Sequence, residues 1–177
     1  MAAERTKEAT LLYKYYRLMC HQIPSRCYFL YGAQTWYPLM SEDGGRQSFD
    51  EAAGTDAGRG LDRSFYGNPQ MGYKTAICQR DIAIYGGMAL FCLLFCLTAM
   101  RIRPPKLILP VLIGVLPIAA DGGTQLLGNV FPKVFPFRES DPLLRTVTGA
   151  LFGFCLCWYL IPLLERSLQE KDKYDRS

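Results

Sequence analysis

A single carboxylate within an otherwise apolar stretch is the first residue of this sequence with a chemical implication. Asp121 lies in Leu107–Leu127, where the other polar side chains carry no charge. An ionised side chain at the centre of a membrane-spanning helix costs at least ~2.5–3.5 kcal/mol, so it seldom faces lipid. We therefore expect Asp121 to point toward other helices. Its predicted partner is Arg80 or Arg145, each near the end of another apolar segment.

Further polar residues are predicted to join Asp121 in one cluster near the outer membrane interface. Cys20, His21 and Cys78 are expected to approach Asp121 there, because the polar ends of their segments lie at the same membrane depth. Gln125 follows Asp121 by one helical turn and shares its face, and His21 is the only histidine of the chain. These three are the catalytic candidates. The candidates for holding a lipid or a small anionic ligand, such as one with a phosphate, are Arg26, Arg80, Arg145, Thr124 and Thr148. The open alternative is a set of hydrogen bonds and ion pairs that only locks the helices together.

Thiols, an imidazole and a carboxylate also suggest a metal site. Cys20, His21, Cys78 and Asp81 lie outside the apolar cores of the segments, and all three ligand types bind zinc. The spacing is weak support, because there is no CxxC or HExxH pattern. A structural hydrogen-bonded cluster and a disulfide at an oxidising outer face, joining Cys78 to Cys20 or to Cys27, remain open as well.

Three segments are long and apolar enough to cross a bilayer, which needs about 17–25 residues. They are Ile82–Met100, Leu107–Leu127 and Val147–Leu164. We predict an all-α fold: an integral membrane bundle of three to four transmembrane helices with one long extramembrane loop. Pro110 and Pro117 predict a kink in the second span. Close helix crossings are expected at Gly86, Gly87, Gly149 and Gly153.

The first 32 residues carry an ambiguous segment. Leu11–Tyr31 is rich in Tyr and Leu but contains Lys14, Arg17 and Pro24. It is expected to be a helix packed beside the others, either spanning the membrane or lying amphipathic at its surface.

The basic residues of one short connection predict the orientation. Arg101, Arg103 and Lys106 lie between the first two spans, so this connection should be cytoplasmic. Residues 33–81 then form an outer-side loop, residues 82–164 the core of three helices, and residues 165–177 a cytoplasmic tail. The net charge of +4 comes without a long basic run, so nucleic-acid binding is not expected.

Four ordered motifs resemble a known family. Cys20-His21-Gln22-Ile23-Pro24-Ser25-Arg26, Cys78-Gln79-Arg80-Asp81, Asp121-Gly122-Gly123-Thr124-Gln125 and the run from Arg145 to Gly153 are similar to CHQxPxR, CxRC, DGxTQ and RxxTGxxxG. These patterns are typical of small bacterial and archaeal predicted integral membrane proteins of unknown function. Asp81 stands where the family pattern has its second cysteine, which argues against a CxxC redox role.

The functional hypotheses therefore start from the membrane. The resemblance implies a multi-pass protein of a bacterial or archaeal cell membrane, in contact with the lipid bilayer. The first hypothesis is a buried polar site that binds or processes a lipid or small anionic ligand; whether it is an enzyme stays open. The alternative is an accessory or structural subunit of a larger membrane protein complex, with other membrane subunits as partners.

Overall fold

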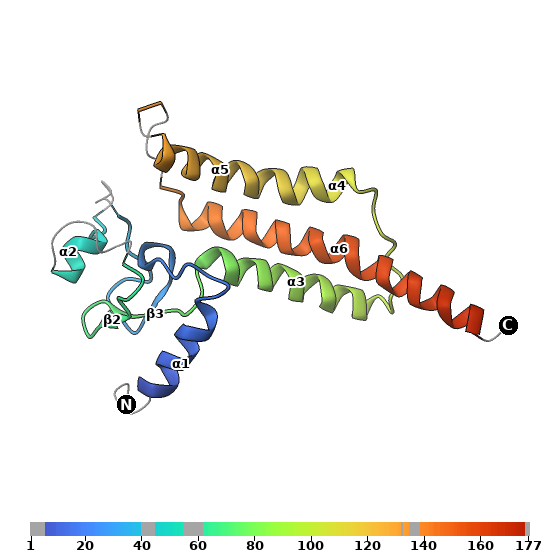
Figure 1. The fold of residues 1–177 in the computed structure, drawn as a ribbon, viewed down its shortest axis with the longest axis horizontal. Coiled ribbons are helices and arrows are strands. Elements are labelled where there is room, and N and C mark those ends of the chain that lie inside the picture. The colour runs from blue at the N-terminus through green and yellow to red at the C-terminus, as the bar shows by residue number, and fades with distance from the viewer. Residues whose placement is uncertain (1–5, 40–44, 55–61, 132, 135–138, 176–177) are drawn as a thin grey trace. The chain divides into compact units, whose positions relative to one another are not determined.

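The structure is a computed structural model that describes residues 6–39, 45–54, 62–131, 133–134 and 139–175. The chain divides into two compact units, an N-terminal unit of Met1–Asp81 and a C-terminal unit of Ile82–Ser177. Figure 1 shows their elements. Each unit is described separately below.

The N-terminal unit contains short elements joined by loops. Its helices are α1 (Thr6–Tyr16), the 3-10 turn η1 (Pro24–Arg26) and α2 (Phe49–Ala53). Strands β1 (Phe29–Leu30), β2 (Gly67–Asn68) and β3 (Gly72–Lys74) form an antiparallel sheet in the order β1-β3-β2. The all-α prediction did not include these short strands, because strands of two or three residues leave no alternation of polar and apolar residues to detect.

An aromatic core stabilises this unit. Phe29, Tyr37, Phe49 and Met71 are buried together, and the rings of Phe29 and Tyr37 meet edge to face at 5.0 Å. Helix α2 begins with a capping box, in which Ser48 and Glu51 satisfy each other's backbone N–H groups. The segment predicted as an outer-side loop is thus partly a folded structure with its own core.

The continuous helix predicted over Leu11–Tyr31 does not form. Helix α1 ends at Tyr16, and its 11 residues span about 16 Å, too little for a bilayer core of about 30 Å. Beyond it, Gln22 adopts a left-handed conformation (φ 53°), and Pro24 begins η1. Proline lacks the N–H that a helix interior needs, so the chain turns here instead of continuing as a helix.

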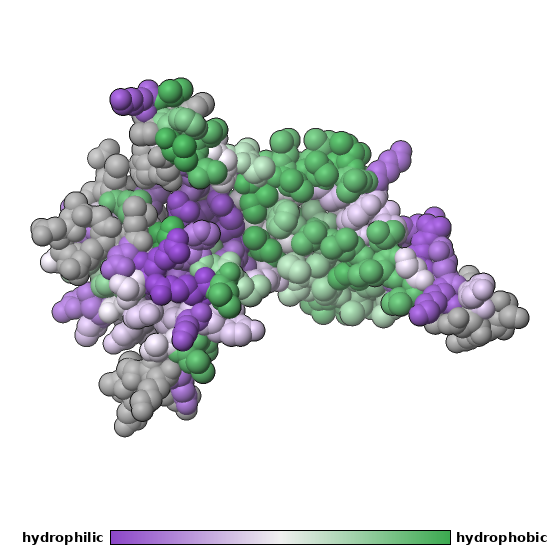
Figure 2. All heavy atoms as spheres, in the orientation of Figure 1, coloured by the Kyte–Doolittle hydropathy of each residue, from purple (hydrophilic) through white to green (hydrophobic). Residues whose placement is uncertain are grey.

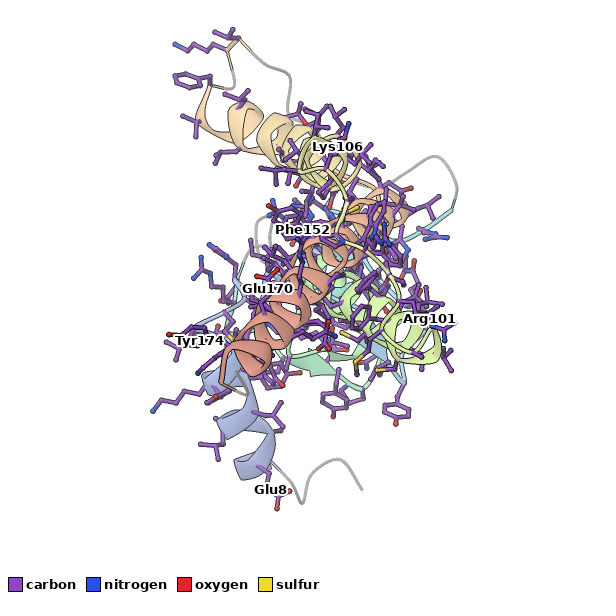
Figure 3. All side chains as sticks on the ribbon, turned by 90° about the vertical axis from the view of Figure 1, so that its right-hand side faces the viewer. Glu8, Arg101, Lys106, Phe152, Glu170 and Tyr174 are labelled. Atoms are coloured by element: carbon purple, nitrogen blue, oxygen red, sulfur yellow. The ribbon has the colours of Figure 1, made fainter. Side chains whose placement is uncertain are left out.

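The C-terminal unit contains the membrane-spanning helices. Among the residues that the structure describes, three helical segments are long and apolar enough to cross a membrane, namely Gln79–Leu97, Ile108–Gly128 and Pro142–Lys171. The first is α3 (Gln79–Leu97), which begins in the last residues of the N-terminal unit, and the third lies in α6 (Pro142–Asp175). Helix α6 lies between α3 and the α4–α5 segment (Figures 1 and 3). The three predicted spans are confirmed, although α6 extends further at both ends than its apolar run.

The second span is interrupted near its two prolines. It consists of α4 (Ile108–Pro110), a π-helical turn η3 (Val111–Val115) and α5 (Leu116–Val130). Pro117 cannot donate to the carbonyl of residue 113, and a π turn widens the helix where such a bond is lost. The helix is therefore locally widened here, while the kink expected from the two prolines stays a prediction.

Glycines bring α3 and α6 into close contact. A Cβ added at Gly87 would lie 2.2 Å from the carbonyl oxygen of Ala150, and one at Gly153 would lie 2.0 Å from that of Ile84. Both are backbone atoms that a rotamer change cannot move. A Cβ on Gly86 would meet nothing within 4 Å, so the expectation of a close crossing at Gly86 is wrong. Phe91, Phe95 and Cys157 form the adjoining core.

The outer surface of these helices is apolar. Large hydrophobic side chains such as Leu93, Leu112 and Leu160 are exposed on all three. Figure 2 shows this hydrophobic surface over the helices and a polar C-terminal end of α6. Such a surface would be costly in water and is suited to lipid, so the helices contact the bilayer.

Candidate functional site

Two cysteines and one aspartate meet in the N-terminal unit. The ligand atoms of Cys20, Cys78 and Asp81 all lie within 4.8 Å of one another. The Cys78 thiol donates to Oδ2 of Asp81 at 3.2 Å. Backbone N–H groups of Gln22 (3.5 Å) and Cys78 (3.3 Å) donate to the sulfur of Cys20. We call these three residues the thiol–carboxylate cluster.

Gln22 and Lys74 position this cluster. The Gln22 amide donates to the carbonyls of Tyr13 (2.8 Å) and Ala76 (2.9 Å). The Lys74 ammonium donates to the carbonyls of Gln22 and Arg63, each at 2.9 Å. Gln79 adds a bond from its amide to the Cys27 carbonyl at 3.3 Å. The loop carrying Cys20 is thereby fixed to the segment that carries Cys78 and Asp81.

Lys74 is itself in an unusual setting. Its side chain is 2% exposed, and its ammonium lies 5.5 Å from the Tyr66 ring centre and 5.9 Å from that of Tyr13. Burial lowers the pKa of Lys74 to about 8. The carbonyl and ring contacts compensate for the water that the ammonium loses, so this lysine has a structural role beneath the cluster.

The cluster makes its two cysteines unequal. A hydrogen bond from the Cys78 side chain lowers the pKa of Cys20, and the backbone N–H groups act in the same direction. The same contact and burial raise the pKa of Cys78. Cys20 is therefore the more acidic thiol of the pair. Cys27, by contrast, is fully buried, and burial raises its pKa to about 12, so it stays a neutral thiol.

A second polar group lies in the C-terminal unit around Asp121. Asp121 is 3% exposed, as the cost of a lipid-facing carboxylate requires. Ser140, also buried, donates its hydroxyl to Oδ2 of Asp121 at 3.0 Å. The guanidinium of buried Arg145 lies 3.9 Å from Glu139. Ser140 is thus a partner of Asp121 in the structure, while a pairing with Arg80 or Arg145 stays a prediction.

The remaining predicted residues fall into different surroundings. Gln125 is buried on the Asp121 face of α5, and its amide nitrogen has no hydrogen-bond partner in the described part of the chain. The hydroxyls of Thr124 and Thr148 bond to carbonyls of their own helices, which makes them poor candidates for ligand contacts. Arg26 and Arg80 are half-buried, and His21 is exposed. A shared site joining Cys20, His21 and Cys78 to Asp121 stays a prediction.

Five contributing residues were missed by the sequence reasoning, among them Gln79, which belongs to the second motif. Gln22 belongs to the first motif, so its place in that motif was a signal that it has a role. Lys74, Glu139 and Ser140 carry no such signal, because an isolated lysine or serine in a polar segment is normally a surface residue.

The thiol–carboxylate cluster is chemically suited to a metal ion. Thiolate and carboxylate are ligands of zinc, with Zn–S near 2.3 Å and Zn–O near 2.0–2.2 Å. The N–H groups that donate to the Cys20 sulfur are the kind of outer contact that orients a metal ligand. All seven cysteines of the chain are free thiols in the structure.

Comparisons with known proteins support the membrane assignment. Residues 59–159 match the model of a family described as predicted membrane proteins (DUF2085). An uncharacterised protein of Methanocaldococcus jannaschii is 28% identical over 166 residues, which cover 92% of this chain and 74% of that protein. No solved structure matches the chain. Since the matched region is more than half of the sequence and includes all or most of each candidate span, the chain belongs to the DUF2085 family of predicted membrane proteins.

Proposed function

We propose that this protein is a metal-binding membrane protein that holds a zinc ion through Cys20, Cys78 and Asp81. The observation that carries the proposal is the convergence of their three ligand atoms within 4.8 Å. Two sequence-distant segments contribute, since Cys20 lies 58 residues before Cys78. Such a convergence needs a folded unit to create it, and Gln22 and Lys74 supply the bonds that do so.

The distances are close to those that a metal requires. Two sulfurs around a tetrahedral zinc stand about 3.8 Å apart, given Zn–S bonds of about 2.3 Å. The cluster needs a contraction of about 1 Å at most, because no pair of ligand atoms is more than 4.8 Å apart. Loss of the Cys78 proton would replace its hydrogen bond to Asp81 by metal coordination. Three protein ligands leave a fourth position for water or for an oxygen of a ligand.

Substitutions of the cluster test the proposal through metal content. Wild-type protein, purified in detergent and loaded with zinc, should retain one zinc per chain by mass spectrometry of metals. Cys20→Ser and Cys78→Ser should each lower zinc affinity by about 10-fold or more, since a hydroxyl is a poor substitute for thiolate. Asp81→Cys should keep the metal, because a third thiolate is also a zinc ligand.

Two controls separate ligation from other effects. Cys96→Ser removes an exposed thiol of α3 outside the cluster and should leave zinc content unchanged. His21→Ala should also leave it unchanged unless His21 supplies the fourth ligand, in which case affinity falls. The proposal fails if the wild-type protein does not retain zinc, or if Cys20→Ser and Cys78→Ser retain it like the wild type. Zinc lost from Cys20→Ser while its circular dichroism and thermal unfolding match the wild type excludes misfolding of the unit as the cause.

The anionic-ligand hypothesis has a weaker basis than the metal. Of its three arginines, Arg145 already lies beside the carboxylate of Glu139, which offsets the charge that would attract an anion. The role of an accessory subunit stays a prediction. It is tested by gentle solubilisation of the protein, which should show whether partner chains copurify in stoichiometric amount.

A further inference from the structure

A cavity lies where α3 ends and the last part of α6 passes it. Its volume is about 570 Å³, and it is lined by the end of α3, the connection to α4 and the α6 residues from Pro162 to Gln169. Helix α3 is closed here by Ala99 and Met100, which both adopt left-handed conformations (φ 50° and 61°). This turn directs the following residues, Arg101 to Pro104, over the side of the cavity.

The cavity is apolar at its base and cationic around its mouth. Phe95 and Pro162 are buried, and both line it. Arg101, Arg103 and Arg166 line the same cavity and are exposed. A ligand that fits must therefore present an anionic group to the guanidinium groups and an apolar group to the base of the cavity.

Two of the three arginines are available for such a ligand. Arg166 pairs with Glu170 at 3.2 Å one helical turn away. Arg101 and Arg103 form no ion pair with any side chain that the structure describes. Glu165 is the carboxylate that lines the cavity, and it accepts a bond from Gln169 at 2.8 Å. The cavity therefore has a net positive charge. Its positive charges without an ion-pair partner among the described side chains are those of Arg101 and Arg103, on the connection between α3 and α4.

The position of the cavity along the helices indicates which kind of anion it binds. It lies at the ends of the apolar runs of two spanning segments, Gln79–Leu97 and Pro142–Lys171, where lipid headgroups meet water. Basic pockets between spanning helices at this level bind phosphorylated lipid headgroups. Guanidinium groups suit phosphate through paired N–H donors, and an acyl chain can cover the apolar base.

We propose that this cavity binds the headgroup phosphate of an anionic phospholipid. Arg101 and Arg103 donate to the phosphate oxygens, and the first carbons of the acyl chains contact Phe95 and Pro162. The site is independent of the thiol–carboxylate cluster, which lies in the N-terminal unit, so either can be present without the other.

Native mass spectrometry of the full chain in detergent tests the proposal with three probes: phosphatidylglycerol, zwitterionic phosphatidylcholine and inorganic phosphate. Phosphatidylglycerol should be retained in preference to phosphatidylcholine, and excess inorganic phosphate should not displace it. Arg101→Gln and Arg103→Gln should each weaken its retention by about 10-fold, the value of one charge-assisted hydrogen bond. Both residues are exposed, so these variants should fold.

Lys106→Gln is the matched control. It removes one positive charge from the same connection, but Lys106 does not line the cavity; Figure 3 shows it apart from Arg101, beside α4. Its effect should be less than about 2-fold. An equal loss in Lys106→Gln would mean diffuse attraction to the connection and would overturn the site. Equal retention of phosphatidylcholine, or displacement by inorganic phosphate, would overturn the choice of an anionic lipid.

Discussion

Gly87→Ala should force α3 away from α6 and destabilise the C-terminal unit by about 3 kcal/mol or more. The added Cβ would lie 2.2 Å from the carbonyl oxygen of Ala150 and 3.0 Å from the backbone nitrogen of Phe154. Overpacking costs typically 1–3 kcal/mol when side chains can move, and here both neighbours are backbone. SDS-induced unfolding in micelles, followed by circular dichroism, measures the loss. Faster thiol labelling of buried Cys157 should report the separated helices.

The neighbouring glycine supplies the control. Gly86→Ala makes the same chemical change one residue earlier, where nothing lies within 4 Å of the new Cβ. It should be neutral or stabilise by about 0.5–1 kcal/mol, because alanine loses less backbone entropy in a helix. Equal destabilisation by the two variants would mean that α3 and α6 do not pack in the register described.

Asp121→Ala should destabilise the same unit by about 3–5 kcal/mol. The substitution removes the acceptor of the Ser140 hydroxyl and a buried carboxylate that we predict to pair with Arg80 or Arg145. Breaking a buried charged arrangement by removing one partner is costly, since the remaining groups stay desolvated. Asp121→Asn keeps an acceptor and should lose less than Asp121→Ala. The same SDS titration measures both.

Asp141→Asn is the control for this loss. Asp141 is exposed and adjacent to Ser140, and asparagine caps a helix about as well as aspartate. Its cost should stay within about 0.5 kcal/mol. If Asp121→Ala costs no more than Asp141→Asn, Asp121 has no structural role in the unit, and the small cost would argue that its carboxylate faces water or lipid.

The spanning helices could be predicted from the sequence because hydrocarbon leaves few choices. A backbone in lipid must satisfy its own hydrogen bonds, so an apolar run long enough to cross forms a helix. The ends were less predictable: α6 continues to Asp175 although its apolar run stops at Leu164. Polar residues also form helices, and hydropathy alone does not indicate where such a helix ends.

The N-terminal unit was harder to predict because tertiary contacts decide it. The tyrosines and leucines after Thr10 suggested a long helix. In the structure the ring centres of Tyr13 and Tyr66 lie 4.7 Å apart, and the Lys74 ammonium donates to the Gln22 carbonyl, so contacts with distant residues determine where the helix ends. Partners so distant in sequence leave no local pattern. The closeness of Cys20 and Cys78 was expected from the assigned membrane depth of their segments, while the bonds that create it were not.

X-ray absorption at the zinc edge tests the central claim most directly. Zinc-loaded wild-type protein should show two sulfur neighbours at about 2.3 Å, from Cys20 and Cys78, with oxygen or nitrogen neighbours at about 2.0–2.2 Å. That ligand set would match the cluster of two thiols and one carboxylate. A spectrum with oxygen and nitrogen neighbours alone, or a protein that excludes zinc because Cys20 and Cys78 are joined as a disulfide, would contradict the account.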